Sequence, residues 1–563
     1  MIYHCEDHTC NYWDEGEKLP ERCPQCGRKL LRANEADMTG DDWTALGNTL
    51  WDAEASDKKR MVDCFRKAAY LGSAWGVCNL GICMEQGNGV EADPVQAFWL
   101  YQQAVEMGSL NAVCCLGVCY QYGIGTAPDA KQAAELYCKA AEYGSPRGQM
   151  LLARAFHDGI GVEADAAEAV HWVRAAAYQR YGEGMYRLGV CYEYGDGVEQ
   201  NWEHAVHWFR EAAESGVSVA MTDLGYCYEK GCGVEQSWEQ AFFWYRRGAE
   251  CGDPVSMSNL GLCYKRGYGV EQNWQEAIKW YEQGAQCGDL QSMHNLACCY
   301  ERGEGVEQNE DRALYWYRRG AEAGSDYCMY CLGWNYSNGE GVEQNMTEAI
   351  RWYTAAAEGG NADAMHDLGW HYDHGEGVEQ DMKKAICWYE RAAEQNHPAA
   401  MNSLGECYAM GRGVPRDLET AMEWYRRAAE LGEAMADYNM GWHLEQAGKL
   451  SEAYAHYRKA ADGNDDSAWW ALGRFYENGV VVAQDGKEAR RCYETGEKLG
   501  SVKCKMRLAR CKLLGIGGRR AKKAGLDLCR QALELAKESS EKEDYGYEAE
   551  MNLLRRTIAE NES

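Results

Sequence analysis

Proline, phenylalanine and positive charge are all scarce in this chain. Only 8 of its 563 residues are Pro and only 7 are Phe, against 37 Tyr and 21 Trp. Asp and Glu number 88 and Lys and Arg number 58, which gives a formal net charge of -30. Because this excess of acid repels phosphate backbones and anionic lipids, we expect neither nucleic acid nor a membrane as the partner.

Long apolar runs are missing as well. No stretch of about 18 apolar residues occurs, so no membrane-spanning helix is predicted. The first residues, Met1 to Cys5, are neither basic nor a long apolar run, so no export signal is predicted. The 27 Cys of an unexported chain are better explained as reduced thiols and metal ligands than as disulfides. We therefore expect a cytoplasmic protein.

A 36-residue repeat built around a Leu-Gly pair dominates the sequence. We call the first residue of this pair the anchor. Eleven anchors follow one another at a constant spacing of 36: Leu80, Leu116, Leu152, Leu188, Leu224, Leu260, Leu296, Leu332, Leu368, Leu404 and Met440. Leu46, Leu472 and Leu508 extend the series at both ends, which makes fourteen units.

Each unit predicts two helices. Small and apolar residues around the anchor recur at helical spacing, and two Gly at seven and nine residues after it predict the end of the first helix and a turn. A residue suited to N-cap the second helix stands thirteen after the anchor in all ten complete units. These residues are Asp93, Asp129, Asp165, Asn201, Ser237, Asn273, Asn309, Asn345, Asp381 and Asp417. Six of them have Glu or Gln three residues on, as in a capping box.

The unit anchored at Met440 lacks the Gly-x-Gly turn. Its turn is four residues shorter, which explains the spacing of 32 to the next anchor, Leu472. Ser451 is the predicted cap of its second helix. This unit looks more like a plain tetratricopeptide repeat.

The full pattern is Leu-Gly-x-x-Tyr, Gly-x-Gly-Val, Asp or Asn, then Ala-x-x-Trp-Tyr-x-x-Ala-Ala. It closely resembles the Sel-one-like repeat family, a branch of the tetratricopeptide-like superfamily, over roughly residues 41–530. The resemblance implies an all-α, right-handed α-solenoid that acts as a scaffold or adaptor rather than as an enzyme. We predict a metal-binding module at 1–35, the repeats at 36–530 and C-terminal capping helices at 531–563.

Two Cys pairs occupy the first 35 residues: Cys5 with Cys10, and Cys23 with Cys26 in a Cys-Pro-x-Cys-Gly knuckle. Thiolates at such spacing, in a segment too small for a core, predict a tetrahedral structural zinc site. The module resembles the zinc-ribbon and rubredoxin-like class, in which iron is the less common metal. His4 or His8 could replace a thiol of the first pair.

Other chemistry finds less support in the sequence. The Gly-x-Gly turns follow no strand and recur ten times, so they predict turns rather than nucleotide-binding loops. Neither Gly-x-Ser-x-Gly nor His-Glu-x-x-His occurs. The alternative function is a repeat-borne hydrolase of the β-lactamase-like type found in some secreted family members. Those members carry paired Cys within each repeat and a signal sequence, and this chain shows neither.

The resemblance also implies where a partner binds. In tetratricopeptide-like solenoids the first helices line the concave face, and the positions five and two before the anchor and two and six after it point there. Between units 332 and 440 these positions hold large amphipathic residues, the types that dominate binding energy at interfaces. They are Tyr327, Tyr330, Trp334, Asn338, His366, Trp370, His374, Tyr438 and Trp442. The alternative is that these Trp residues pack against neighbouring first helices. Together with the acidic residues around them, these candidate residues favour a protein or peptide with aromatic or aliphatic anchors flanked by Lys or Arg.

Two further patterns are predicted to be structural. His366, His371 and His374 form the densest His cluster of the repeats, and we expect surface residues there rather than a second metal site. Cys recurs three residues after the anchor, which is typical of a small buried packing residue rather than a redox centre. These are Cys83, Cys119, Cys191, Cys227, Cys263, Cys299 and Cys407.

Overall fold

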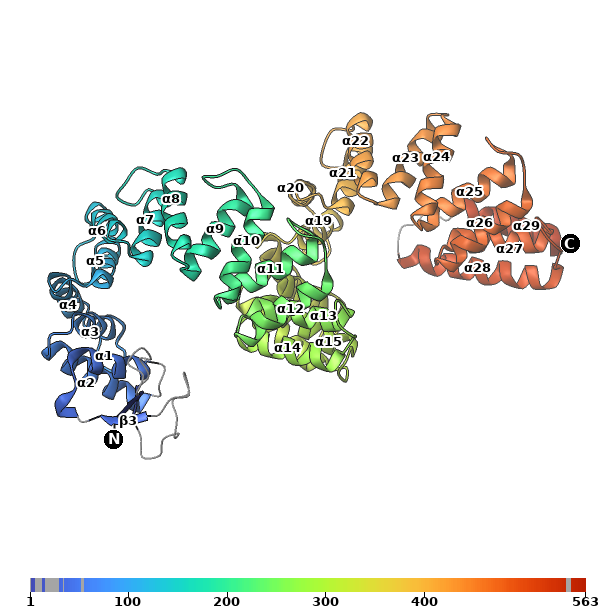
Figure 1. The fold of residues 1–563 in the computed structure, drawn as a ribbon. Coiled ribbons are helices and arrows are strands. Elements are labelled where there is room, and N and C mark those ends of the chain that lie inside the picture. Colours follow the sequence, from blue (N-terminus) through green and yellow to red (C-terminus); the bar gives the residue numbers. More distant parts are fainter. Residues whose placement is uncertain are drawn as a thin grey trace. The chain divides into compact units, whose positions relative to one another are not determined.

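The fold is given by a computed structural model that describes residues 2–5, 13–15, 30–33, 35–51, 55–542 and 548–562. The chain consists of two compact units, Met1–Ser292 and Met293–Ser563. Within each unit, α-helices follow one another as antiparallel pairs (Figure 1). The predicted all-α array of tandem helix hairpins is confirmed. None of the described helices is long and apolar enough to span a bilayer.

The described helices have nearly uniform lengths, and α15 contains the boundary between the two units. Those of the first unit are α1 (Gly40–Thr49), α2 (Ala55–Tyr70), α3 (Ala74–Gln86), α4 (Pro94–Glu106), α5 (Leu110–Tyr122), α6 (Ala130–Glu142), α7 (Pro146–Asp158), α8 (Ala166–Tyr178), α9 (Gly182–Tyr194), α10 (Trp202–Glu214), α11 (Ser218–Lys230), α12 (Trp238–Glu250), α13 (Pro254–Arg266) and α14 (Trp274–Gln286). The boundary helix is α15 (Leu290–Arg302). Those of the second unit are α16 (Glu310–Glu322), α17 (Asp326–Asn338), α18 (Met346–Glu358), α19 (Ala362–His374), α20 (Met382–Glu394), α21 (Pro398–Met410), α22 (Leu418–Glu430), α23 (Ala434–Gln446), α24 (Leu450–Asp462), α25 (Asp466–Asn478), α26 (Gly486–Lys498), α27 (Val502–Leu514), α28 (Lys522–Lys542) and α29 (Glu548–Glu562). The predicted end of the repeats at residue 530 falls within α28.

A three-stranded antiparallel sheet precedes the helices. Its strands are β1 (Ile2–Cys5), β2 (Trp13–Glu15) and β3 (Leu30–Ala33), in the order β2-β1-β3. His4 pairs with Trp13, and Cys5 pairs with Leu30. A short 3₁₀ helix, Glu35–Asp37, leads from β3 towards α1.

The ends of the helices follow the repeat. All ten predicted N-caps are confirmed, because each of these side chains accepts a hydrogen bond from a backbone N–H in the first turn of the second helix. The first helices end at glycines in the left-handed region, as at Gly195, whose φ is 75° and whose N–H bonds to the Cys191 carbonyl. The second glycine of each turn packs close to the preceding unit: a Cβ at Gly197 would collide with the carbonyl oxygen of Ala166.

Two predictions about capping are wrong. α24 begins at Leu450 with Lys449 as its N-cap, so Ser451 lies inside the helix rather than before it. The reason is that Lys449 N–H already closes the end of α23 on the Leu444 carbonyl, and the next helix starts at once. Among the helices with described caps, the reciprocal bond of a capping box forms only between Thr39 and Asp42, and not at the six units predicted to have it.

One contact recurs inside nearly every helix pair. The residue after the anchor faces an aromatic ring on the second helix, and in eleven of fourteen units that residue is Gly. A Cβ added to these glycines would lie 2.5–2.8 Å from a ring carbon in ten units, and closer still at Gly473. The facing rings are also the largest fully buried side chains of the described chain. They are Phe65, Tyr101, Tyr137, Phe209, Tyr245, Tyr281, Tyr317, Tyr353, Tyr389, Tyr425, Tyr457 and Tyr493.

In two of the three units without this glycine, the second helix also lacks the aromatic ring. Where Ala153 and Ala509 follow the anchor, the second-helix position holds the smaller Val173 and Cys529. Ala297 is the exception, because Tyr317 remains fully buried in its unit. The absence of a Cβ and the presence of a ring are therefore coupled in all but one unit.

Small residues also face each other between consecutive units. Where the second helix has Gly, the next first helix has a slightly larger residue, as in Gly248 against Ser256 and Gly320 against Cys328. Where the second helix has Ala, the facing residue can be Gly, as in Ala176 against Gly184. The summed size of the pair is therefore held nearly constant, which keeps adjacent units at close approach.

Replacing Gly405 by Ala tests the contact within a pair. Gly to Ala inside a helix ordinarily stabilises by about 1 kcal/mol. Here the new Cβ would lie 2.5 Å from Cε1 of Tyr425, so we expect a loss of about 1–3 kcal/mol instead. The measurement is amide hydrogen exchange in α21 and α22 together with thermal unfolding.

The matched control is Gly359→Ala at the end of α18. Gly359 has an ordinary φ of -70°, and the nearest atoms to an added Cβ are 3.3 Å away. We expect this variant to unfold like the parent chain. If the two variants behaved alike, the ring contact would not be what requires the glycine.

Candidate protein-binding site

The predicted partner-binding residues all lie in the second compact unit, on the first helices α17, α19 and α23. Four large rings among them are well exposed: Tyr327 at 53%, Trp334 at 47%, Trp370 at 37% and Trp442 at 43%. We call these four residues the aromatic face. Its three Trp share one register, two residues after the anchor.

Hydrogen bonds tie these first helices together side by side. Tyr330 donates to Oδ2 of Asp367 at 3.0 Å, which joins α17 to α19. Nε2 of His366 lies 3.5 Å from Oγ of Ser403, which joins α19 to α21. Asn439 donates to Oδ1 of Asn402 at 3.0 Å, which joins α21 to α23. In each case the residue two before one anchor meets the residue one before the next.

Two of the predicted binding residues, Tyr330 and His366, take part in these bonds between helices, and a third, Tyr438, is partly buried. Tyr330, His366 and Tyr438 are all half-buried. Burial raises the pKa of Tyr438 to about 12, and burial together with the charge of Asp367 raises the pKa of Tyr330. These residues hold neighbouring helices more than they offer surface to a partner.

The remaining predicted residues support the exposed Trp. His374 stacks on Trp370 with ring centroids 4.3 Å apart, and its Nδ1 lies 2.9 Å from the Trp370 carbonyl oxygen. Asn338 donates to the Trp334 carbonyl at 3.1 Å. Both side chains lie one helical turn after their Trp and are exposed.

Two exposed apolar residues on these first helices and on α21 were not among those predicted. Met410 on α21 is 65% exposed and Met435 on α23 is 49% exposed. They occupy the registers six after and five before their anchors, so the register alone could have identified them. Glu406 takes the place of the Trp on α21 and accepts a bond from Asn439 at 3.2 Å. Met is a common residue at adaptable binding surfaces.

The His cluster is only partly at the surface. His371 is buried, so the expectation of a surface position is wrong for it. Its Nδ1 lies 3.1 Å from the Glu376 carbonyl, and burial lowers its pKa. The reason is that its register faces Tyr353 within the pair, with ring centroids 5.6 Å apart. Within the described ranges, no group of three or more His, Cys, Asp or Glu could hold a metal ion.

The periodic Cys are packing residues for the most part. Cys83, Cys119, Cys227, Cys263 and Cys407 are buried, and burial raises the pKa of each thiol to about 11 or 12. A thiol outside this register behaves differently. A hydrogen bond from Cys78 and the charge of Arg147 lower the pKa of Cys115 to about 7.

The predicted zinc ligands fall mostly outside the described residues. Cys10, Cys23 and Cys26 lie there, and so does His8, whereas Cys5 and His4 belong to β1. The strand pairing places the end of β1 beside the starts of β2 and β3. In the sequence, Cys10 shortly precedes β2, and the Cys23 and Cys26 pair shortly precedes β3.

Comparison with known proteins agrees with this geometry. A family model described as Sel1 repeat matches the chain twelve times between residues 76 and 501, and the matches cover most of the chain. The crystal structure of c5321, a protective antigen present in uropathogenic Escherichia coli strains displaying an SLR fold, is 30% identical, with a TM-score of 0.53. The similarity covers 85% of this chain and 97% of that one.

A Sel1 repeat protein from Oxalobacter formigenes is 32% identical over 43% of this chain and 96% of its own, with a TM-score of 0.40. No curated protein matches the chain. Sel1 repeats generally mediate protein interactions. Twelve repeat matches, the helix pairs that they predict and a relative aligned over nearly its whole length lead to one conclusion: the chain belongs to the Sel1 repeat family.

Proposed function

We propose that this chain is a non-enzymatic scaffold whose aromatic face binds a peptide or a peptide segment of a protein. The observation that carries the proposal is the exposure of three Trp, at 37–47%, at one register of the first helices α17, α19 and α23. Large amphipathic rings supply most of the binding energy in many interfaces. Exposing large apolar rings to water is unfavourable, and such exposed patches commonly mark sites where a partner binds.

The charge around the face favours a basic peptide. Asp363 on α19 is exposed, and a hydrogen bond from His397 lowers its pKa, so it stays ionised. Glu406, which Arg412 approaches to 3.7 Å, carries a second carboxylate at the position between Trp370 and Trp442. With the net charge of -30, these groups favour aromatic or aliphatic anchors flanked by Lys or Arg.

The double variant Trp334→Ala with Trp370→Ala tests the face. The probe is a fluorescein-labelled octapeptide, Lys-Lys-Leu-Phe-Lys-Leu-Arg-Lys, followed by fluorescence anisotropy. We expect at least about a tenfold loss of affinity, since each buried interface Trp commonly contributes more than 2 kcal/mol. Helical content and melting temperature should stay nearly unchanged because both rings are exposed.

Two controls sharpen this test. Trp99→Ala removes a ring that is 53% exposed on α4, in the other compact unit, and should leave binding unchanged. A peptide with Glu in place of every Lys and Arg should bind much more weakly. A large loss of stability in the double variant would identify the two Trp as core residues, and unchanged binding would reject the face.

We also propose that Cys5, Cys10, Cys23 and Cys26 bind one structural zinc ion. Support comes from the pairing of the strands and the order of the chain: the end of β1, with Cys5, pairs with the starts of β2 and β3, and in the sequence Cys10 comes before β2 and Cys23 and Cys26 come before β3. Four thiolates in two such pairs match the tetrahedral preference of zinc. The bound ion would tie the two connections of the sheet together.

Changing Cys23 and Cys26 to Ser tests the zinc site. We expect the parent chain to carry one zinc per molecule when purified under reducing conditions without chelator, and the variant to carry none. Elemental analysis measures this directly. The helical signal should persist, because α1 to α29 contain none of the four ligands. A parent chain free of metal would contradict the proposal.

A further inference from the structure

One unit of the first compact unit departs from the rule that a ring faces the residue after the anchor. The unit anchored at Leu152 has Ala153 and Val173 where most units have Gly and Tyr. Its residue five after the anchor is His157, where the units of Tyr101, Tyr245 and Tyr493 have a Glu that bonds the Tyr hydroxyl. The ring and its polar partner are therefore replaced together.

A pocket of about 580 Å³ occupies this unit, between α7, α8 and α9. This volume falls within the range of ~300–1,000 Å³ typical of ligand sites. Its apolar wall includes Ala153, Val170, Val173 and Val190. Because Val173 stands where twelve other units bury an aromatic ring, the pocket contains a space that an aromatic side chain fits elsewhere in the same fold.

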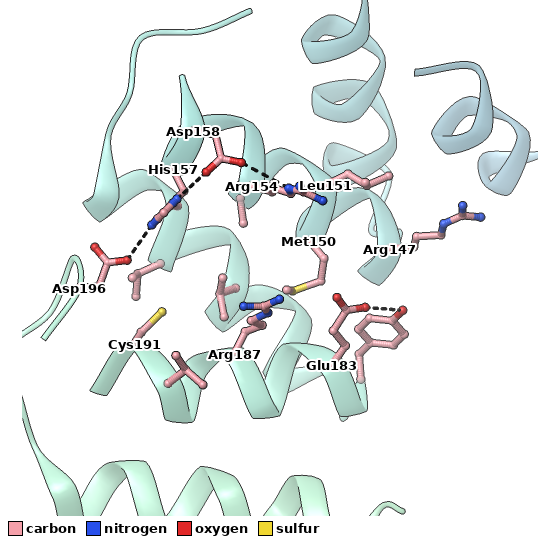
Figure 2. Close-up of a pocket in the computed structure, with 16 residues that line it drawn as sticks. Arg147, Met150, Leu151, Arg154, His157, Asp158, Glu183, Arg187, Cys191 and Asp196 are labelled. Atoms are coloured by element: carbon pink, nitrogen blue, oxygen red, sulfur yellow. Dashed lines mark hydrogen bonds and ion pairs between the residues drawn. The ribbon is translucent and has the colours of Figure 1, made fainter. Parts of the chain in front are cut away.

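The rim of the pocket is charged, and part of that charge is internally balanced (Figure 2). His157 lies between two carboxylates, with Nδ1 2.7 Å from Asp158 and Nε2 3.1 Å from Asp196. Hydrogen bonding to Asp158, with a further contribution from Asp196, raises the pKa of His157. Arg154 pairs with Asp158 at 3.3 Å. Two basic groups thus offset two acids.

Arg187 is a cation of the pocket that takes no part in these ion pairs. It is exposed, it lines the pocket from α9, and it forms no hydrogen bond or ion pair with any described residue. Figure 2 shows its guanidinium extending towards Met150 between the two first helices. Arg147 donates to Oδ1 of Asn111 at 2.6 Å and to Sγ of Cys115 at 3.6 Å. The remaining acid is Glu183, which accepts from the Tyr181 hydroxyl at 3.5 Å.

We propose that this pocket binds an aromatic side chain of an acidic peptide segment, in which Asp or Glu adjoins Phe or Tyr. The ring occupies the space beside Val173, and the neighbouring carboxylate pairs with Arg187. Guanidinium groups bind carboxylates through two parallel hydrogen bonds, which favours this pairing over one with a neutral group. The charge preference is opposite to that of the aromatic face, and the site lies in the other compact unit, so either proposal can fail alone.

The decisive variant closes the pocket with the chain's own ring. Ala153→Gly combined with Val173→Tyr restores the pair found in most other units, so the protein should fold with an unchanged or higher melting temperature. The probe is a fluorescein-labelled hexapeptide, Ser-Glu-Phe-Asp-Glu-Ser, measured by anisotropy at low salt. We expect the parent chain to bind it and this double variant to show no measurable binding.

The charge is tested separately with Arg187→Gln. Loss of one charge-assisted hydrogen bond typically weakens binding by about tenfold or more. The matched control is Arg351→Gln on α18. The Arg351 side chain is 70% exposed and pairs only within its own helix, so this variant should bind the hexapeptide like the parent chain. A peptide with Ala in place of Phe, and a peptide with Lys in place of all three acidic residues, should each bind at least about ten times more weakly.

Several results would overturn the proposal. Equal binding by the Ala153→Gly, Val173→Tyr variant would show that the pocket is not the site. Equal binding of the Lys peptide would reject the pairing with Arg187, and no binding by the parent chain would reject an acidic peptide altogether. Binding of free 3-phenylpropionate as tight as that of the hexapeptide would assign the pocket to a small aromatic acid instead of a peptide.

Discussion

The contact between a residue without a Cβ and a buried aromatic ring organises this protein. It sets how closely the two helices of each pair approach, because a Cβ would lie 2.5–2.8 Å from the ring in ten units. The ring then fills the centre of the pair, and in several units its hydroxyl bonds a carboxylate five residues after the anchor, as Tyr457 bonds Glu445 in the unit with the shorter turn. Small residues between consecutive units, such as Gly320 against Cys328, hold the next pair at a similarly close approach.

Local features of this fold could be predicted from the sequence, and cross-helix features could not. Ten N-caps and the glycine turns follow from residues close together in the chain, and they are confirmed. The prediction for Ser451 is wrong because Lys449 both closes α23 on the Leu444 carbonyl and occupies the N-cap position of α24. The burial of His371 and the bond from Tyr330 to Asp367 depend on which side chain the neighbouring helix presents, which spacing alone does not reveal.

Both proposed binding sites lie where the chain departs from its repeat. Identical units would give a uniform surface, so a binding site requires positions that differ from their equivalents. Trp334, Trp370 and Trp442 interrupt a register that holds Ile82 or Arg154 elsewhere. The pocket at Val173 arises in the same way, because the absence of one ring in a regular series opens a space. The sequence could have narrowed the search to the two units that lack the ring, those of Val173 and Cys529.

A double-mutant cycle between Gly405 and Tyr425 tests the central contact most directly. Gly405→Ala, Tyr425→Val and their combination are compared through the opening free energies of α21 and α22 in native-state hydrogen exchange. If the glycine exists to admit the ring, Ala should cost stability only while the ring is present, with a coupling of about 2 kcal/mol. A coupling near zero would mean that the glycine and the ring contribute independently, which would contradict this account of the fold and of the pocket.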